Sequence, residues 1–362
     1  MRIRWSLTTA MVTLLLLGAC DETGTTGVQL GFLDGTDDDP QIGLIVNSLG
    51  RSVTLFQLGN PAERREVALG ASSAVTPITL SVSGTRAAVP LGNAASVAIL
   101  NLQGLRVERF FLFPSGNTTA SVFGGEETVF VANLIDDVVG RFRLDQAEDD
   151  IVDVVDVAPA PSAVLLHGDE VVVISANLDD AFAPLGNGVV TALDPVTLDV
   201  RGTVETGGSN AMAGAVGPDG LLYVLNTGDF VSPGSLTIID LETLEEVETI
   251  DGMGVGPGGI FIDDDGLAYV SGFFFGTIVW DTATRQFVRD PNDPVCARLS
   301  DGSCRGAFDV DTDADGNVYQ VFFGSAAEGL EPAVFVFEAG TFVLRDSVMA
   351  GQGASSIEIV EF

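Results

Sequence analysis

An acidic run near the C-terminal end of the chain has the spacing of a calcium loop. Asp311, Asp313 and Asp315 alternate within the segment DTDADGN, and Gly316 follows them. Ca²⁺ prefers several hard oxygen ligands at alternating positions, so this segment is a candidate calcium site. Phe322 stands where an EF-hand loop needs glutamate, and acidic residues before glycine also form ordinary turns. The sequence leaves both interpretations open, and it suggests no other cofactor.

The chain offers few other groups for catalysis. It has no Lys, and its one His, His167, lies in the turn-like sequence HGD. A Schiff-base lysine and a P-loop lysine are therefore excluded, as are most histidine-based metal and acid–base sites. We expect His167 to be a solvent-exposed turn residue, and the sequence identifies no catalytic residue.

The first twenty residues have the features of an export signal. Arg2 and Arg4 precede an apolar stretch that is too short to span a membrane comfortably, and the stretch ends in LGAC at Cys20. This ending resembles the lipobox of bacterial lipoproteins. The resemblance implies that residues 1–19 are a signal peptide and that Cys20 carries lipid. The protein would then lie in the bacterial cell envelope, on the periplasmic side or the outer surface, with the leaflet undecided. The polar, acidic residues 20–41 are expected to form a flexible tether.

The net charge excludes several classes of partner. The chain has 16 basic and 51 acidic residues, all the basic ones are Arg, and the formal net charge is −35. Such a surface repels nucleic acid phosphates and anionic lipid headgroups, so we expect no nucleic acid partner and membrane contact only through the lipid. The acid excess fits either an ordinary solvated surface or adaptation to high salt.

Two cysteines lie in the longest predicted loop, residues 290–307. In an oxidising envelope, with Cys20 lipidated, Cys296 and Cys304 are expected to form a disulfide that closes a loop of about nine residues. No other Cys or His is near them in sequence, so we do not expect a zinc site.

The rest of the chain repeats one short pattern. Residues 217–250 contain three β-strands joined by turns, and variants of this unit recur along most of the chain. Asp194, Asp240 and Asp281 end equivalent strands at intervals of about 46 and 41 residues, and a Thr follows each of them three positions later. Four strands per unit at this period predict an all-β fold, a β-propeller.

The unit count predicts how the propeller closes. Six complete four-stranded units run from residue 78 to residue 347, three strands precede them at 42–69, and one follows at 356–361. Three strands plus one make a seventh blade that is shared by the two ends of the chain, which closes the ring and removes open sheet edges. Residues 42–362 are therefore expected to form one β-propeller of seven four-stranded blades, and we expect a monomer.

The blades resemble YVTN-type and NHL-like propeller repeats. The resemblance rests on the PDG turn at residues 218–220 and on strands that end in Asn133, Asn177 and Asn226. Propellers of this kind include lactonases and streptogramin-type lyases, so the resemblance also implies possible metal or acid–base chemistry at the central channel.

Long loops and phenylalanines mark one face of the ring, which we call the top face. It carries the turns between the second and third strands of each blade and the links between blades, and its long loops are the likeliest recognition surface. These loops are residues 178–187, 227–234, 290–307 and 324–332. The candidate binding residues are Phe182, Phe230, Phe273, Phe274 and Phe275, although packing between blades is the commoner role of propeller Phe.

Two functions are compatible with these features. The first is a lipid-anchored, non-catalytic propeller that binds a protein, peptide or glycan of the cell envelope, or scaffolds an envelope complex, through its top face. The second is a lactonase-like hydrolase or lyase with a metal at the central channel.

Overall fold

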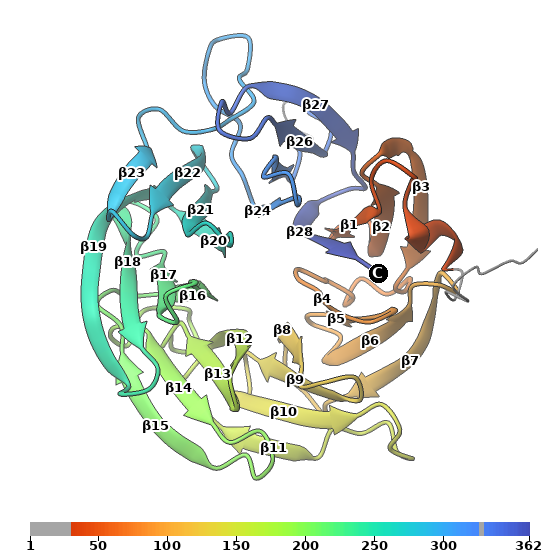
Figure 1. Cartoon of the computed structure of the whole chain (residues 1–362). Coiled ribbons are helices and arrows are strands. Elements are labelled where there is room, and N and C mark those ends of the chain that lie inside the picture. Colours follow the sequence, from red (N-terminus) through yellow and green to blue (C-terminus); the bar gives the residue numbers. More distant parts are fainter. Residues whose placement is uncertain (1–29, 326–328) are drawn as a thin grey trace, which may run out of the picture.

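Seven four-stranded antiparallel sheets are arranged in a ring (Figure 1). The computed structural model describes residues 30–325 and 329–362. It confirms an all-β fold with seven propeller blades. The one helix among these residues is the 3-10 helix η1 (Gly31–Asp34), and none of them forms a helix long and apolar enough to cross a membrane.

The blade that closes the ring takes its strands from both ends of the described chain. Its strand order is β28-β1-β2-β3. The strands are β28 (Ala354–Glu361), β1 (Gln41–Asn47), β2 (Ser52–Gln57) and β3 (Asn60–Ala68). β1 and β28 pair antiparallel from Gln41 opposite Glu361 to Asn47 opposite Ala354. The shared seventh blade is thus confirmed, and we number it blade 1.

Each of the other six blades uses four consecutive strands, which run outward from the channel. Blades 2 to 4 contain β4 (Ser81–Ser83), β5 (Arg86–Pro90), β6 (Ser96–Asn101), β7 (Arg106–Leu112), β8 (Thr118–Phe123), β9 (Thr128–Asn133), β10 (Val138–Arg143), β11 (Asp153–Asp156), β12 (Pro161–His167), β13 (Glu170–Ser175), β14 (Val189–Leu193) and β15 (Val200–Glu205).

Blades 5 to 7 complete the ring. They contain β16 (Ala211–Val216), β17 (Leu222–Asn226), β18 (Pro233–Asp240), β19 (Glu245–Val255), β20 (Pro257–Ile262), β21 (Leu267–Gly272), β22 (Gly276–Asp281), β23 (Gln286–Arg289), β24 (Asp309–Thr312), β25 (Val318–Phe322), β26 (Ala333–Phe337) and β27 (Leu344–Met349).

The hydrophobic core lies between the faces of neighbouring blades. Second and third strands are short apolar runs because both of their faces are covered; every residue of β2 is buried, whereas most of β3 is exposed at the rim. Tyr223 of blade 5 meets Trp280 of blade 6 edge-on at 6.1 Å, and both side chains are buried. The Trp-Asp dipeptide at residues 280–281 thus contributes a core residue and a turn residue.

The aspartates that marked the repeat form the turns between third and fourth strands. Oδ1 of Asp194 accepts hydrogen bonds from the N–H groups of Val196 and Thr197, and Asp240 and Asp281 bond their own turns in the same way. Hydrogen bonds from Arg201 and from the turn lower the pKa of Asp194 to about 2. The repeated aspartates are therefore local turn formers.

Side-chain hydroxyls join six of the seven pairs of neighbouring blades near the channel. In each pair, a Ser or Thr donates to a main-chain carbonyl near the start of the next blade, over distances of 2.7 to 3.2 Å. The bonds run from Ser355 to Ile78, Thr79 to Thr119, Thr119 to Pro161, Ser162 to Ala211, Thr227 to Pro257 and Ser271 to Phe308. Because both partners are uncharged, these hydroxyl junctions bury no charge.

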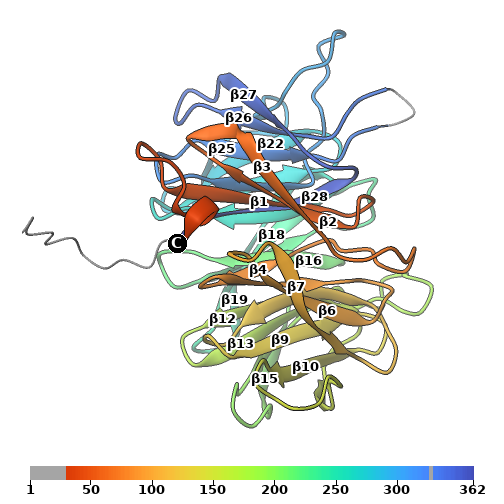
Figure 2. The same cartoon turned by 90° about the vertical axis from the view of Figure 1, so that its right-hand side faces the viewer.

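The chain enters the ring on the face opposite the top face. Gln57, the last residue of β2, donates hydrogen bonds to the carbonyls of Phe32 and Gly35, and Leu33 of η1 is buried in the core between blades 1 and 2. Figure 2 shows η1, in red, and the C-terminus on the left, whereas the loop between β25 and β26 extends to the right. Part of the expected tether, from Leu30 onward, is therefore packed against the propeller, because Leu33 is apolar enough to be buried there. The signal peptide, Cys20 and the first part of the tether lie outside the described residues.

Candidate binding surface

Four phenylalanine rings form a continuous row on the top face. Phe230 stacks on Phe273 with ring centroids 6.3 Å apart, Phe273 meets Phe308 at 4.8 Å, and Phe308 stacks on Phe323 at 4.6 Å. We call these four residues the aromatic row. They come from the β17–β18 loop, the β21–β22 loop, the residue before β24 and the residue after β25, so the row crosses three blades.

The backbone presents Phe230 to solvent. This residue has a φ of 59°, an uncommon value for a non-glycine residue, and its side chain is 43% exposed. Asp229 fixes the loop, because its Oδ1 accepts hydrogen bonds from the N–H groups of Val231 and Ser232. A strained residue held in place by its own turn holds the ring outward on the top face.

Glycines beneath the row let the rings lie against the backbone. A methyl group on Gly258 would lie 2.6 Å from the ring of Phe273, and one on Gly256 would lie 2.9 Å from Phe274 and 3.3 Å from Phe230. Gly256 also has a φ of 66°. The sequence GVGPGG therefore supports the aromatic rings, a role that sequence analysis did not assign to it.

The structure separates the five candidate phenylalanines into three groups. Phe230 and Phe273 belong to the row, and Phe274 beside them is 65% exposed. Phe275 turns inward and packs against the core between blades 5 and 6. Phe182 is 58% exposed on the β13–β14 loop but makes none of the ring contacts of the row. Phe323 and Phe308 complete the row, and sequence analysis did not single out Phe308.

A pocket of about 340 Å³ opens at one end of the row. Phe323, Leu330, Pro332 and Leu49 supply its apolar lining, and Glu331 also lines it. The pocket lies between blade 7 and the closing blade, because Leu49 belongs to the β1–β2 turn. The row therefore runs from an exposed ring at one end to a concave apolar site at the other.

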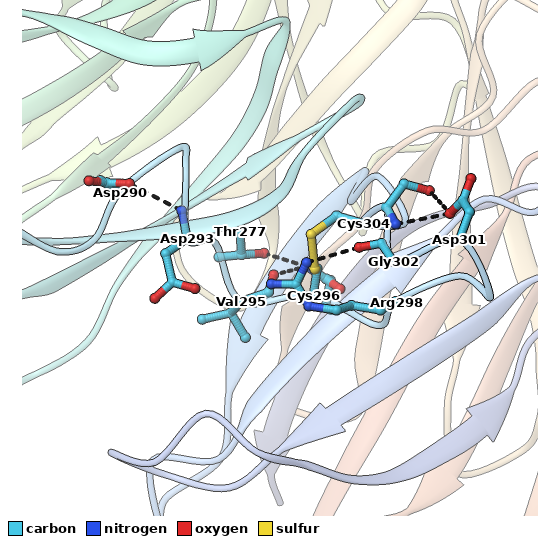
Figure 3. The surroundings of a disulfide bond; sticks show 11 residues. Thr277, Asp290, Asp293, Val295, Cys296, Arg298, Asp301, Gly302 and Cys304 are labelled. Atoms are coloured by element: carbon cyan, nitrogen blue, oxygen red, sulfur yellow. Dashed lines mark hydrogen bonds between the residues drawn. A yellow bond between two sulfur atoms is a disulfide. The ribbon is translucent and has the colours of Figure 1, made fainter.

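The predicted disulfide is present in the long loop between β23 and β24 (Figure 3). Cys296 and Cys304 have Cα atoms 5.5 Å apart. Two backbone hydrogen bonds between Thr277 and Val295 attach the loop to blade 6. The guanidinium of Arg305 lies 5.1 Å from the ring centroids of both Phe322 and Phe335 in blade 7. The loop is thus fastened to two blades and flanks the row on a rigid base.

The central channel holds a second set of chemically distinctive residues. Its cavity of about 470 Å³ is lined by the first strands of the blades and contains Asp309, Asp311 and Glu358. Asp309 Oδ2 accepts a hydrogen bond from the N–H of Ile357 at 3.1 Å, and Asp311 Oδ2 accepts one from Ile359 at 2.7 Å. Two carboxyl groups of blade 7 therefore bind the first strand of blade 1, and we call this contact the carboxyl junction.

Burial raises the pKa of all three carboxyl groups. The pKa of Asp309 rises to about 6 and that of Glu358 to about 7, and the pKa of Asp311 lies well above its usual value. Asp309 and Glu358 keep part of their surface open to the channel, although protein surrounds each of them on most sides. The N–H of Val82 in blade 2 bonds to Glu358 and opposes the shift. Raised pKa values in a cavity are typical of active sites. Here, however, each carboxyl accepts a main-chain hydrogen bond from a neighbouring blade, which also explains its position structurally.

The calcium-like segment does not converge on a common point. Asp311 faces β28, whereas Asp313 caps its own turn and accepts hydrogen bonds from Asn317 and the hydroxyl of Tyr319. Asp315 is exposed. The pairs Asp219–Tyr223 and Asp263–Tyr269 repeat the Asp313–Tyr319 contact in blades 5 and 6. Across residues 30–325 and 329–362, no group of three His, Cys, Asp or Glu residues is placed to hold a metal ion. These contacts give Asp311 a role between blades and Asp313 a role in its turn, and calcium binding by this segment stays a prediction from the sequence.

His167 ends β12 at the turn between the first and second strands of blade 4. This turn lies on the face opposite the top face, and the side chain is partly exposed. His167 is therefore remote from the aromatic row.

Comparison with known proteins establishes the fold and nothing finer. No protein-family model and no curated protein sequence matches the chain. Among solved structures, the chain is similar to Kuenenia stuttgartiensis hydrazine synthase, with a TM-score of 0.62 and 13% identity over 81% of this chain and 97% of that one. It is also similar to a functionally unknown protein from Desulfotomaculum acetoxidans DSM 771, with a TM-score of 0.64 and 11% identity over 88% of this chain and 98% of that one. At these identities the chain shares a seven-bladed β-propeller fold with both proteins, and its function has to be argued from its own residues.

Proposed function

We propose that this protein is a lipid-anchored propeller of the bacterial cell envelope that binds a partner on its top face and is not an enzyme. The aromatic row carries the proposal, because it joins rings from three blades, with Phe230 exposed at one end and a concave apolar pocket at the other. Exposed aromatic side chains bring a large apolar area and lose little conformational entropy on binding, which makes them effective binding residues.

The face on which the N-terminal segment joins the ring supports this proposal. Lipid on Cys20 would hold the protein through a segment that joins the ring on the face opposite the row. The row would then face away from the membrane and stay accessible to an envelope partner. Labelling of growing cells with a tagged fatty acid should mark the wild type and not the C20S protein. Equal labelling of both proteins, or of neither, would contradict lipid anchoring at Cys20.

The binding role can be tested by capture from envelope extract with three proteins: wild type, F230A/F273A and F182A. Phe182 is the matched control, because it is an exposed Phe on the same face but outside the row. We expect wild type and F182A to retain the same envelope partner and F230A/F273A to lose it. Equal capture by all three proteins would exclude the row as the binding site.

The carboxyl groups in the channel favour one alternative, a hydrolase or lyase. Because all three already accept hydrogen bonds from neighbouring blades, we give this alternative second place. Metal analysis of the purified protein tests it together with an assay of lactone hydrolysis by wild type and E358Q. A bound divalent ion and an activity that E358Q abolishes would favour the enzyme over the binding module.

A further inference from the structure

The aromatic row lacks the cations that cover other phenylalanines of this chain. Four arginines lie over Phe rings elsewhere, at 4.5 to 5.4 Å from the ring centroids: Arg65, Arg109, Arg289 and Arg305. Within the part of the chain that the structure describes, none of these contacts involves a ring of the row. A guanidinium over an aromatic face is attracted by the ring, most strongly where water is excluded. The exposed ring of Phe230 and the partly exposed ring of Phe273 are therefore open to the kind of contact that this fold already uses internally.

Carboxylates lie beside the row, so the row should prefer a positively charged ligand. Asp229 is adjacent to Phe230, and Glu331 lines the pocket that contains Phe323. Hydrogen bonds from Ser232 and Val231 lower the pKa of Asp229, so this carboxylate stays ionised at neutral pH. A ligand that covers the row would thus meet negative charge at both ends.

The charge of the chain argues against its own segments as occupants. Residues 20–41 contain no Arg and no Lys, so the expected tether cannot supply a cation. A second copy would bring the same net charge of −35 and would be repelled. Nucleic acid and anionic membrane are disfavoured for the same reason. A basic segment of another protein remains as the complementary partner.

The spacing of the row suits an extended chain. The three centroid steps of 6.3, 4.8 and 4.6 Å make a path of at most about 16 Å. An extended peptide rises ~3.3 Å per residue, so about five residues cover this path. Alternate side chains point to the same side and lie ~6.6 Å apart, which is close to the step between Phe230 and Phe273.

Given that the row is the binding site, we propose that its ligand is an extended, arginine-bearing segment of another envelope protein. Guanidinium groups of alternate residues lie over Phe230 and Phe273, and Asp229 and Glu331 pair with basic side chains at the two ends. The contact is non-covalent, and electrostatic complementarity sets its specificity and its dependence on salt.

The test uses labelled peptides of about nine residues in which Arg alternates with Ser. Matched peptides carry citrulline, which has a similar shape but no charge, or Lys in place of Arg. Binding to the full-length mature protein is measured by fluorescence anisotropy. We expect the Arg peptide to bind most tightly, the Lys peptide several-fold more weakly and the citrulline peptide not measurably. Raising NaCl from about 50 mM to about 500 mM should weaken the Arg complex.

Protein variants assign the contact to the row. We expect F230A/F273A to raise the Kd of the Arg peptide about tenfold, D229N to raise it about threefold and F182A to leave it unchanged. F230A alone, at a side chain that is already 43% exposed, serves as the second variant if the double variant unfolds early. Equal binding of the Arg and citrulline peptides, or an unchanged Kd for the Phe variants, would overturn the proposal.

The proposed binding surface and the proposed ligand can be disproved separately. If capture of an envelope partner depends on the row but the Arg peptide does not bind, the binding surface stands and the arginine-bearing ligand is wrong. Row-dependent binding of a neutral oligosaccharide would then assign the row to glycans. If neither capture nor peptide binding depends on the row, both proposals fail.

Discussion

The carboxyl junction and the six hydroxyl junctions both join neighbouring blades near the channel, but they do so with different chemistry. Each joins the inner part of one blade to the next, but the hydroxyl junctions donate to carbonyls, whereas Asp309 and Asp311 accept from the N–H groups of Ile357 and Ile359. The carboxyl junction also holds β28, the strand that closes the ring by pairing with β1. Hydrogen bonds to ionisable groups are stronger and depend on pH, so closure should differ from the other junctions in strength and in its response to pH.

Removing β28 should cause the largest loss of stability among the changes considered. A chain that stops after Gly353 loses the strand that pairs with β1 and donates the N–H groups of the carboxyl junction. We expect a loss of about 5 kcal/mol or more in the free energy of unfolding, which is comparable with the total stability of many domains. Circular dichroism during urea unfolding measures this. A truncated protein with an unchanged, cooperative transition would show that the ring does not need closure.

Replacing Asp311 with Ala compares the two kinds of junction directly. The variant leaves the N–H of Ile359 without its partner in a buried site, and we expect it to lose about 2 kcal/mol of stability. Urea unfolding near pH 5 measures the loss. If D311A loses no more stability than a variant of a hydroxyl junction, the carboxyl junction is not stronger than the hydroxyl junctions.

The pH dependence of stability should further separate the closing blade from the hydroxyl junctions. The folded-state pKa of Asp309 is about 6 and that of Glu358 about 7, against ordinary values of 3.8 and 4.5. The folded state therefore binds these protons more tightly, so this part of the stability is fully present below about pH 4 and is lost as pH rises through 6 to 7. Replacing Glu358 with Gln should flatten the fall in Tm over this range and stabilise the protein at pH 7.5 by about 1–2 kcal/mol.

Glu361 provides the control for that experiment. It lies on the same strand as Glu358 but is exposed, so E361Q changes the net charge equally without changing the channel. A pH profile that E361Q flattens as much as E358Q does would assign the effect to general charge repulsion instead of the closing blade.

A single hydroxyl junction should give the smallest effect. Ser162 donates to the carbonyl of Ala211 at 2.8 Å, and we expect S162A to lose about 1 kcal/mol of stability. Because neither partner titrates, the loss should be the same at pH 5 and pH 7.5. A pH-dependent loss in S162A would remove the contrast between the two kinds of junction.

The sequence predicted the fold because its signals are local and repeated. Asp194, Asp240 and Asp281 bond N–H groups two and three residues ahead, so the same chemistry recurs wherever the turn recurs. The pairing of Cys296 with Cys304 is also local. Even the shared blade followed from counting strands, because four strands per blade leave three at one end and one at the other.

The sites could not be predicted in the same way, because they depend on contacts between blades. Asp311, Asp313 and Asp315 look like one motif in sequence, but the two-residue period of a strand places Asp309 and Asp311 together toward β28, and Asp313 already belongs to the turn. Phe308 meets Phe273 from another blade, and no periodicity in the sequence pairs them. The Ser and Thr residues of the hydroxyl junctions are equally scattered.

The shared blade also imposes an order of events during folding. Gln41 and Glu361 face each other although they are about 320 residues apart in the chain, so their pairing closes a far longer loop than any hairpin inside a blade. Relative to a hairpin of about ten residues, the chain entropy of that loop opposes pairing by about 3 kcal/mol more. Until β28 has been synthesised, the other strands can form only an open arc. The apolar face that Phe56 turns toward blade 7 and β28 stays exposed during that interval, which makes the last step of assembly the one most open to aggregation or to help from a chaperone.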